Sequence, residues 1–288
     1  MNHGFRLLTV SVLALLVQTG RAAPLIIDHR HTDITKLTQP QIAKAKQVLN
    51  IAYGHTSHGS QLTSGMAGLV DFANRGGKGL KFPKNFLAFN RGGHEGALDL
   101  HDNAMKGDVG YYPQWVEQTK AYLDNPANAK VNVIIWSWCG QMTGKFKSGS
   151  LESEYLEPMS KLEKAYPKVT FVYMTGHADI GSDAAQKGAC QAIRDFCKAN
   201  GKVLYDFADL EHYDPDGKFY EFVDDNCGVY ATPGKPTQTN WALQWQKSHQ
   251  EGVDWYACGS AHSQALNANQ KAYAAWHLWC ALAERIAK

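Results

Sequence analysis

Short apolar runs alternate with longer amphipathic segments along most of this chain. Each run is nearly continuous in β-branched and aromatic residues, which is typical of strands buried on both faces of a parallel sheet. The runs cover residues 48–53, 86–90, 131–136, 169–174 and 202–207. The pattern therefore predicts about five parallel strands.

Helical patterns separate these runs. In the first pattern, Leu62, Met66 and Leu69 recur at the spacing that places side chains on one face of a helix. The patterns cover residues 59–74, 113–123, 151–165 and 183–200, and one more closes the chain at 267–287. Strands that alternate with helices predict right-handed βαβ units, with helices on both faces of the sheet. We therefore expect an α/β fold.

The segment of residues 211–259 breaks this alternation. It is rich in Asp, Gly, Pro, Asn and Trp and shows little periodicity. Because it is too long for an ordinary connection, we interpret it as a functional loop or a lid inserted before the last helix. No internal repeat appears, and we expect residues 23–288 to form a single domain.

The N-terminal residues 1–22 have the pattern of a secretory signal peptide. Arg6 precedes an apolar stretch at residues 7–17, and Gly20, Arg21 and Ala22 form the expected cleavage site. The apolar stretch is shorter than the roughly 20 residues that a membrane span requires. We therefore expect a secreted or periplasmic protein with no membrane span.

The mature chain has a balanced charge and an even number of cysteines. Without Arg6 and Arg21 it holds 27 basic and 27 acidic residues, which argues against nucleic-acid binding and favours a small or neutral substrate. The cysteines lie at positions 139, 190, 197, 227, 258 and 280, and an even set predicts disulfides in an oxidising compartment. Cys190 and Cys197 lie about two turns apart on a predicted helix, which is too far for a disulfide unless the helix breaks.

Polar side chains follow the predicted strands, where ligands bind in open parallel sheets. The first strand leads into the sequence G-H-T-S-H-G-S-Q-L, which places Ser57 and Ser60 at a turn from strand to helix. Backbone N–H groups at such a turn are unpaired and can hold a developing negative charge. This turn is therefore the best candidate for a nucleophile.

The order of these features resembles the SGNH, or GDSL-type, hydrolase superfamily, and in particular its exported bacterial members with a G-H-x-S-x-G first block. The resemblance covers nearly all of the mature chain. Its blocks here are G-H-T-S-H-G with Ser57, N-R-G-G with Gly93, W-S-W-C-G-Q with Gln141, and C-G-S-A-H-S-Q-A-L-N with His262. It implies a three-layer flavodoxin-like sandwich of about five parallel strands.

The resemblance also implies a reaction and the residues that perform it. The chain would be a secreted serine esterase without a cofactor, which acts on a small acyl ester such as an acetyl ester, with a carbohydrate as one candidate alcohol. Ser57 would be the nucleophile and His262 its base, while the N–H groups of Ser57 and Gly93 and the amide of Gln141 would bind the oxyanion. Ser60 is the second candidate nucleophile.

The catalytic acid departs from the family pattern. The acid usually lies three residues before the histidine, and Gly259 occupies that position here. Asp254 can replace it if the intervening loop folds back toward His262. Otherwise the site is a Ser–His dyad supported by a backbone carbonyl.

Two other functions stay open at this point. His55, His58, His177 and Asp179 offer four nitrogen or oxygen ligands for a divalent metal, which would make the protein a metal-dependent hydrolase. Alternatively, aromatic residues of the long loop form either a sugar-stacking surface or the hydrophobic underside of that loop. These residues are Trp241, Trp245 and Trp255. A sugar-stacking surface with an inert Ser57 would indicate a non-catalytic carbohydrate-binding protein.

The same loop holds an acidic sequence that could bind calcium. It runs from Asp214 through the string D-P-D-G to Glu221, Asp224 and Asp225. A D-P-D-G string is more often a tight turn than a calcium site, and we favour the turn.

Overall fold

The fold of this protein comes from a computed structural model that describes residues 22–286. The predicted signal peptide at residues 1–22 therefore lies outside the described residues except for Ala22. Within residues 22–286, none of the helices combines the length and the apolar character that crossing a bilayer demands.

A seven-stranded sheet forms the centre of the molecule, with the strand order β1-β7-β6-β5-β2-β4-β3. Every neighbouring pair in it is parallel. The strands are β1 (Leu25–Ile27), β2 (Asn50–Gly54), β3 (Phe89–Asn90), β4 (Leu98–His101), β5 (Val133–Trp136), β6 (Thr170–Met174) and β7 (Val203–Tyr205). The architecture is an α/β fold of the Rossmann or flavodoxin-like class.

The prediction of about five strands was too low by two. β1 has only three residues, and β4 has a charged Asp99 between Leu98 and Leu100, so neither forms the continuous apolar run that marks a buried strand. The other five strands overlap the predicted runs, although β2 extends one residue beyond its run and the run at residues 86–90 pairs only over its last two residues. Short strands such as these gain their pairing from the sheet rather than from local sequence.

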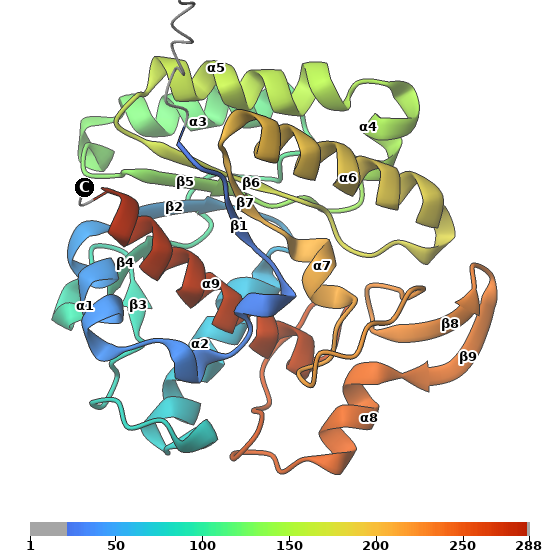
Figure 1. The fold of residues 1–288 in the computed structure, drawn as a ribbon. Coiled ribbons are helices and arrows are strands. Elements are labelled where there is room, and N and C mark those ends of the chain that lie inside the picture. Colours follow the sequence, from blue (N-terminus) through green and yellow to red (C-terminus); the bar gives the residue numbers. More distant parts are fainter. Residues whose placement is uncertain (1–21, 287–288) are drawn as a thin grey trace, which may run out of the picture.

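Helices cover both faces of the sheet and make two separate cores (Figure 1). One face is covered by α1 (Gln39–Val48), α2 (Ser60–Asn74) and α9 (Ala265–Ile286), the other by α3 (Gln114–Asp124), α5 (Glu157–Ala165) and α6 (Asp183–Asn200). Alternate strand residues face the two cores, so Ile51 and Tyr53 belong to the first and Ala52 to the second. The predicted helical layers on both faces of the sheet are confirmed.

The irregular segment of residues 211–259 has structure of its own. It contains an antiparallel pair, β8 (Gly228–Thr232) and β9 (Lys235–Asn240), followed by α8 (Trp241–Ser248), and this part extends from one end of the sheet in Figure 1. Trp241 and Trp245 are 0% and 7% exposed, and Trp255 packs against the same small core. These aromatic residues are the underside of the segment and form no sugar-stacking surface.

The acidic D-P-D-G string folds as a tight turn. The carboxylate of Asp214 accepts hydrogen bonds from the backbone N–H groups of Asp216 and Lys218, both at 3.0 Å, and from the hydroxyl of Tyr220. These bonds close the turn that D-P-D-G sequences favour. The favoured interpretation of this string agrees with the structure.

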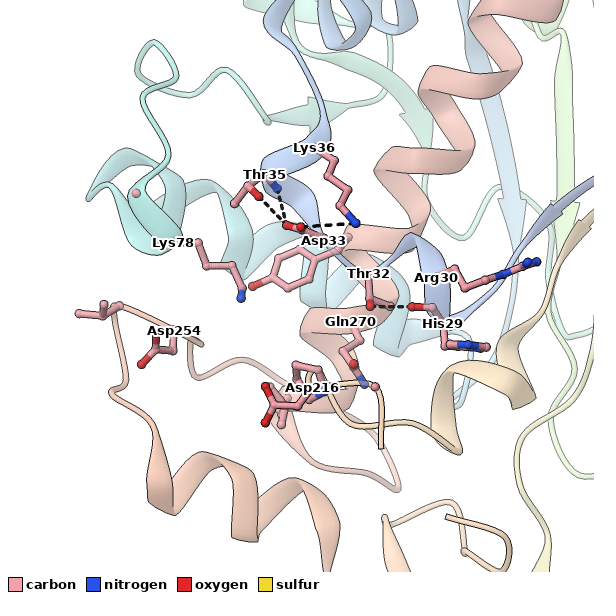
Figure 2. A pocket seen from close by; sticks show the side chains of 16 residues that line it. His29, Arg30, Thr32, Asp33, Thr35, Lys36, Lys78, Asp216, Asp254 and Gln270 are labelled. Carbon is pink, nitrogen blue, oxygen red and sulfur yellow. Dashed lines mark hydrogen bonds and ion pairs between the residues drawn. The ribbon is translucent and has the colours of Figure 1, made fainter. Parts of the chain in front are cut away.

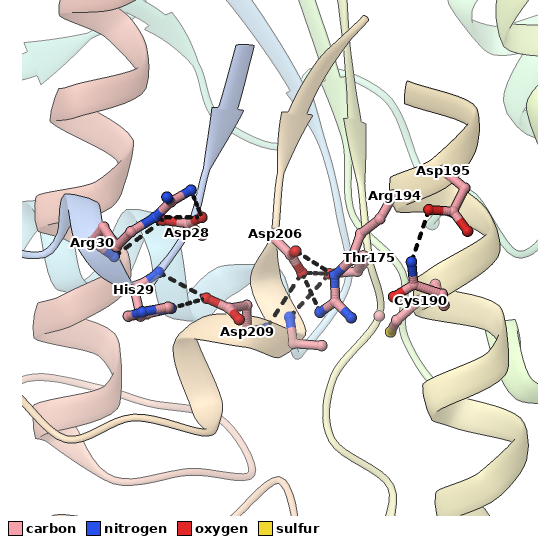
Figure 3. Close-up of polar contacts among 12 residues, drawn as sticks. Asp28, His29, Arg30, Thr175, Cys190, Arg194, Asp195, Asp206 and Asp209 are labelled. Carbon is pink, nitrogen blue, oxygen red and sulfur yellow. Dashed lines mark hydrogen bonds and ion pairs between the residues drawn. The ribbon is translucent and has the colours of Figure 1, made fainter. Parts of the chain in front are cut away.

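A polar cluster joins the carboxyl ends of β1 and β7 at the outer side of the sheet (Figure 3). Asp206 accepts from Arg194 at 2.5 Å and from the hydroxyl of Thr175 at 2.9 Å. Asp209 accepts from His29 Nδ1 at 2.5 Å. Because each of these carboxylates already has a partner, we assign the cluster to holding β1, β7 and α6 together.

All six cysteines lie in the described part of the chain and are free thiols. The disulfides predicted from their even number therefore have no support in the structure. Cys190 and Cys197 both lie on α6, which runs unbroken from Asp183 to Asn200. This geometry agrees with the expectation that these two residues do not pair.

Candidate active site

Ser57 lies in the tight turn that joins β2 to α2 at the carboxyl edge of the sheet. Two glycines let this turn pass close to β5. A Cβ atom on Gly54 would lie 2.4 Å from the ring of Trp136, and one on Gly59 would lie 2.2 Å from Ser137 Oγ. The glycines of the G-H-T-S-H-G sequence are therefore required by close packing.

His262 reaches Ser57 from the loop before α9, with 3.0 Å between its Nε2 and Ser57 Oγ. Its backbone has a φ of 64°, in the left-handed region that few residues other than glycine adopt. Gln61 on α2 holds the loop by donating to the carbonyl of Ala261 at 2.5 Å. A histidine fixed in a strained conformation beside a serine is a mark of a functional site.

His58 connects a thiol to a carboxylate beside this pair. Its Nδ1 lies 3.3 Å from Sγ of Cys139, and its Nε2 lies 3.0 Å from Oδ2 of Asp225. An ionised carboxylate only accepts hydrogen bonds, so Nε2 is the nitrogen that carries the proton. A neutral His58 then presents the lone pair of Nδ1 to the thiol of Cys139.

Burial and charge support these protonation states. Burial lowers the pKa of His58 below its usual value, and this effect outweighs the hydrogen bond to Asp225, so the ring is neutral at neutral pH. Burial also raises the pKa of Asp225, but the hydrogen bond from His58 and the nearby histidines lower it more, so the net pKa lies below the usual value. Asp225 is therefore an anion.

Three imidazole rings form a stack at the site. His58 lies between His177, with ring centroids 3.9 Å apart and planes 5° apart, and His262, at 4.4 Å and 13°. His177 is fixed by a 2.7 Å contact from its Nδ1 to the carbonyl of Ala178. The stack places the loops after β2 and β6 and the loop before α9 in direct contact.

The stacked rings do not suit a shared metal ion. His58, Asp225 and His262 offer ligand atoms within 4.8 Å of one another. However, the lone pair of an imidazole nitrogen lies in the plane of its ring. A metal bound in the plane of His58 would therefore lie well above or below the planes of the stacked rings of His262 and His177. Since metal–nitrogen bonds follow the lone pair, the rings cannot share one ion in this arrangement.

The four predicted metal ligands do not converge on one point, although the rings of His58 and His177 stack. Nε2 of His55 faces Asp102 at 2.8 Å and its Nδ1 faces the carbonyl of Thr56 at 2.9 Å. Asp179 accepts from Thr143 at 3.5 Å. The proposed set of His55, His58, His177 and Asp179 is therefore wrong as a single site.

Gly93 lies at the opposite end of the sheet from Ser57. It follows β3, whose Asn90 is in register with Asp99, and Asp99 is in register with Asn50 at the start of β2. Ser57 follows the other end of β2. The predicted place of Gly93 in the oxyanion hole is therefore wrong, because β3 ends at the amino-terminal edge of its neighbours.

Asp254 lines a separate cavity of about 710 Å³ beside α9 (Figure 2). Its carboxylate accepts from the backbone N–H of Gln250 at 2.8 Å and so closes its own turn. Among residues 22–286, neither a carboxylate nor a carbonyl hydrogen-bonds to His262. The intervening loop does not fold back in the way that the role of Asp254 as the acid would require.

Gln141 and Ser60 lie near Ser57 with partners of their own. Gln141 Nε2 is 3.3 Å from Oδ2 of Asp108, and the same oxygen accepts from Thr56 at 2.9 Å. The buried carboxylate of Asp108 therefore ties the Gln141 loop to the Ser57 turn. Ser60 donates to the carbonyl of Ser57 at 2.6 Å and begins α2.

The remaining polar residues of the site had only weak signals in the sequence. Asp102 and Asp108 follow β4, which was not predicted, and Asp225 lies in the segment without periodicity. Cys139 stands in the predicted block W-S-W-C-G-Q, but nothing in the sequence shows that it meets His58. A strand assignment at residues 98–101 would have drawn attention to the first two.

No protein-family model matches this sequence, and no curated protein matches it significantly. The function is therefore inferred from the site itself.

Proposed function

We propose that this protein is a serine esterase of the SGNH type that hydrolyses a small acyl ester, such as the acetyl ester of a carbohydrate. The proposal rests on the 3.0 Å hydrogen bond between Ser57 Oγ and His262 Nε2. A serine hydroxyl is a weak nucleophile at neutral pH, so it needs a base within hydrogen-bond reach. These two residues lie 205 positions apart and meet at the carboxyl edge of a parallel sheet.

The reaction would proceed through an acyl-enzyme. His262 takes the proton of Ser57 while Oγ attacks the carbonyl carbon, and then gives that proton to the departing alcohol. Water, activated by the same histidine, releases the acid and restores the serine. No cofactor enters these steps.

Asp225 supplies the negative charge near the base. One of its carboxylate oxygens and a ring nitrogen of His262 lie within 4.8 Å. At this separation the carboxylate stabilises the imidazolium that forms during attack, although it makes no hydrogen bond to His262. The site is therefore a Ser–His dyad with a nearby acid, in place of a linear triad.

The backbone N–H of Ser57 and the amide of Gln141 would bind the oxyanion. The N–H of Ser57 has no acceptor among the described residues, and it precedes the first turn of α2. Asp108 takes only one of the two N–H bonds of Gln141, which leaves the other for the substrate. Each such donor typically contributes about 3 kcal/mol of transition-state stabilisation.

The predicted signal peptide at residues 1–22 would place this esterase in the periplasm or outside the cell. A single catalytic domain would then cover residues 23–288.

A fluorophosphonate probe and p-nitrophenyl acetate test the proposal. We expect the probe to label Ser57, and we expect Ser57→Ala to abolish labelling. Ser60→Ala is the matched control and retains labelling, since Ser60 does not contact His262. His262→Ala should slow ester hydrolysis by at least about 100-fold, the usual contribution of a general base.

Two outcomes would contradict the esterase. Hydrolysis that survives Ser57→Ala and stops with a chelator would indicate a metal-dependent hydrolase. Retention on immobilised glycans without any labelling of Ser57 would indicate a carbohydrate-binding protein.

A further inference from the structure

We propose that Cys139 is a second nucleophile of this cleft, activated by His58 and Asp225, and that it reacts with soft carbon electrophiles of the thioester class. The inference does not depend on Ser57 being a nucleophile, because the esterase dyad uses neither the thiol nor the ring nitrogens of His58.

The first support is a chain of polar contacts that joins a thiol, an imidazole and a carboxylate. The thiol of Cys139 lies 3.3 Å from Nδ1 of His58, whose Nε2 lies 3.0 Å from Asp225. This is the order of nucleophile, base and orienting acid that defines a catalytic triad. Asp225 fixes the tautomer of His58, so the lone pair faces the sulfur.

The second support is the contrast with the other thiols. Cys190, Cys197, Cys227 and Cys280 are buried. Cys258 is half-buried like Cys139, but its sulfur contacts only the carbonyl of Ala265 and the amide of Asn269. Burial raises the pKa of Cys258 to about 11. Among the described cysteines, only Cys139 has an imidazole and a carboxylate behind it.

The third support is the position of the sulfur at the proposed ester site. Cys139 Sγ lies 3.6 Å from Ser57 Oγ, and the adjacent Gly140 is exposed. An electrophile that reaches the serine therefore also reaches the thiol. The thiolate is the reactive form of a cysteine, so a base that takes the proton of the thiol promotes its attack on a thioester.

The thiol, the imidazole of His58 and the thioester supply all the atoms and protons that this step requires. Cys139 Sγ attacks the carbonyl carbon of a thioester and its proton moves to Nδ1 of His58. The new bond between sulfur and carbon forms as the bond to the leaving thiolate breaks, and His58 returns the proton to that thiolate.

Alkylation by iodoacetamide measures the reactivity of each cysteine in the intact protein. Rates come from peptide mapping by mass spectrometry. We expect Cys139 to react at least about tenfold faster than Cys258, its half-buried internal control. Asp225→Asn should remove most of this advantage, because a side-chain amide no longer fixes the tautomer of His58. Glu221→Gln, an exposed charge change in the same segment, should leave it intact.

A thioester substrate distinguishes the reaction of Cys139 from that of Ser57. With phenyl thioacetate, Ser57→Ala should still release thiophenol, and Ser57→Ala/Cys139→Ala should not. Equal release by the two variants, when both are folded, would overturn the proposal. A wild-type Cys139 that reacts no faster than Cys258 would overturn it whether or not the variants fold. Fast alkylation of Cys139 without fluorophosphonate labelling of Ser57 would instead overturn the esterase alone.

Discussion

Single residues decide how closely the Ser57 turn approaches the sheet. Gly59 is the clearest case, since a Cβ atom there would lie 2.2 Å from Ser137 Oγ and 2.4 Å from Cβ of His55. Both neighbours are buried, so neither can move away without disturbing the packing of β2 against β5.

Gly59→Ala should therefore reduce both stability and activity. We expect the free energy of unfolding to fall by about 1–3 kcal/mol, the usual cost of overpacking, and ester hydrolysis to fall with it. Urea denaturation measures the first and p-nitrophenyl acetate the second. Gly144→Ala is the control, because Gly144 lies in α4 (Met142–Ser148) with open space around its Cβ position. Equal effects of the two substitutions would contradict this interpretation.

At the scale of elements, a buried ion pair links three helices. Lys271 on α9 donates to Glu211 at the end of α7 (Phe207–Glu211) at 2.5 Å, and both side chains are almost fully buried. Lys271 also donates to Gln61 on α2, which in turn holds the loop of His262. The network thus links α2, α7 and α9 to the carbonyl of Ala261, the residue before the proposed base.

Lys271→Met should be strongly destabilising, because it leaves a buried carboxylate unpaired. We expect a loss of about 3–5 kcal/mol in the free energy of unfolding, measured by urea denaturation. Adding Glu211→Gln should recover part of this loss, since the double variant holds no unpaired charge. Losses that simply add would show that the pair is not coupled.

The matched control for this experiment is a partly exposed ion pair between α1 and α9. Lys44 donates to Glu284 of α9 at 2.8 Å, and both side chains are partly exposed. Lys44→Met should change the free energy of unfolding by less than about 1 kcal/mol.

At the scale of the whole molecule, two buried histidines and one half-buried histidine couple stability to pH. Burial lowers the pKa of His58, His101 and His277 below the ordinary value of 6.5. Below pH 6.5 the unfolded chain therefore binds more protons than the folded one at these positions, and stability is lost on acidification.

We expect the free energy of unfolding to fall between pH 7.5 and pH 5.5, by at most about 1.4 kcal/mol per pH unit for each histidine. Carboxylates with lowered pKa values, such as Asp225, contribute only at lower pH. Urea denaturation at both pH values measures the slope. His277→Gln keeps a donor for the carbonyl of Asp33 and should reduce the slope, and an unchanged slope would contradict the assignment of His277.

The sequence predicted the helical and sheet layers of the molecule better than the strand register and the contacts of the irregular segment. Continuous apolar runs predicted the buried strands, and the turn that carries Ser57 follows one of these strands. Gly93 was misplaced because strand register cannot be read from an apolar run, and Asn90 pairs only at the level where β2 begins. Asp225 was not assigned to the site because its segment has no periodicity, so only the folded chain shows that it meets His58.

The contact between Ser57 and His262 also has a consequence for synthesis. The ribosome makes the serine turn 205 residues before the histidine. A growing chain therefore carries the proposed nucleophile without its base until α9, the last helix in Figure 1, has been made and packed against α2. The order of translation would therefore separate the proposed nucleophile from its base until this helix has been made.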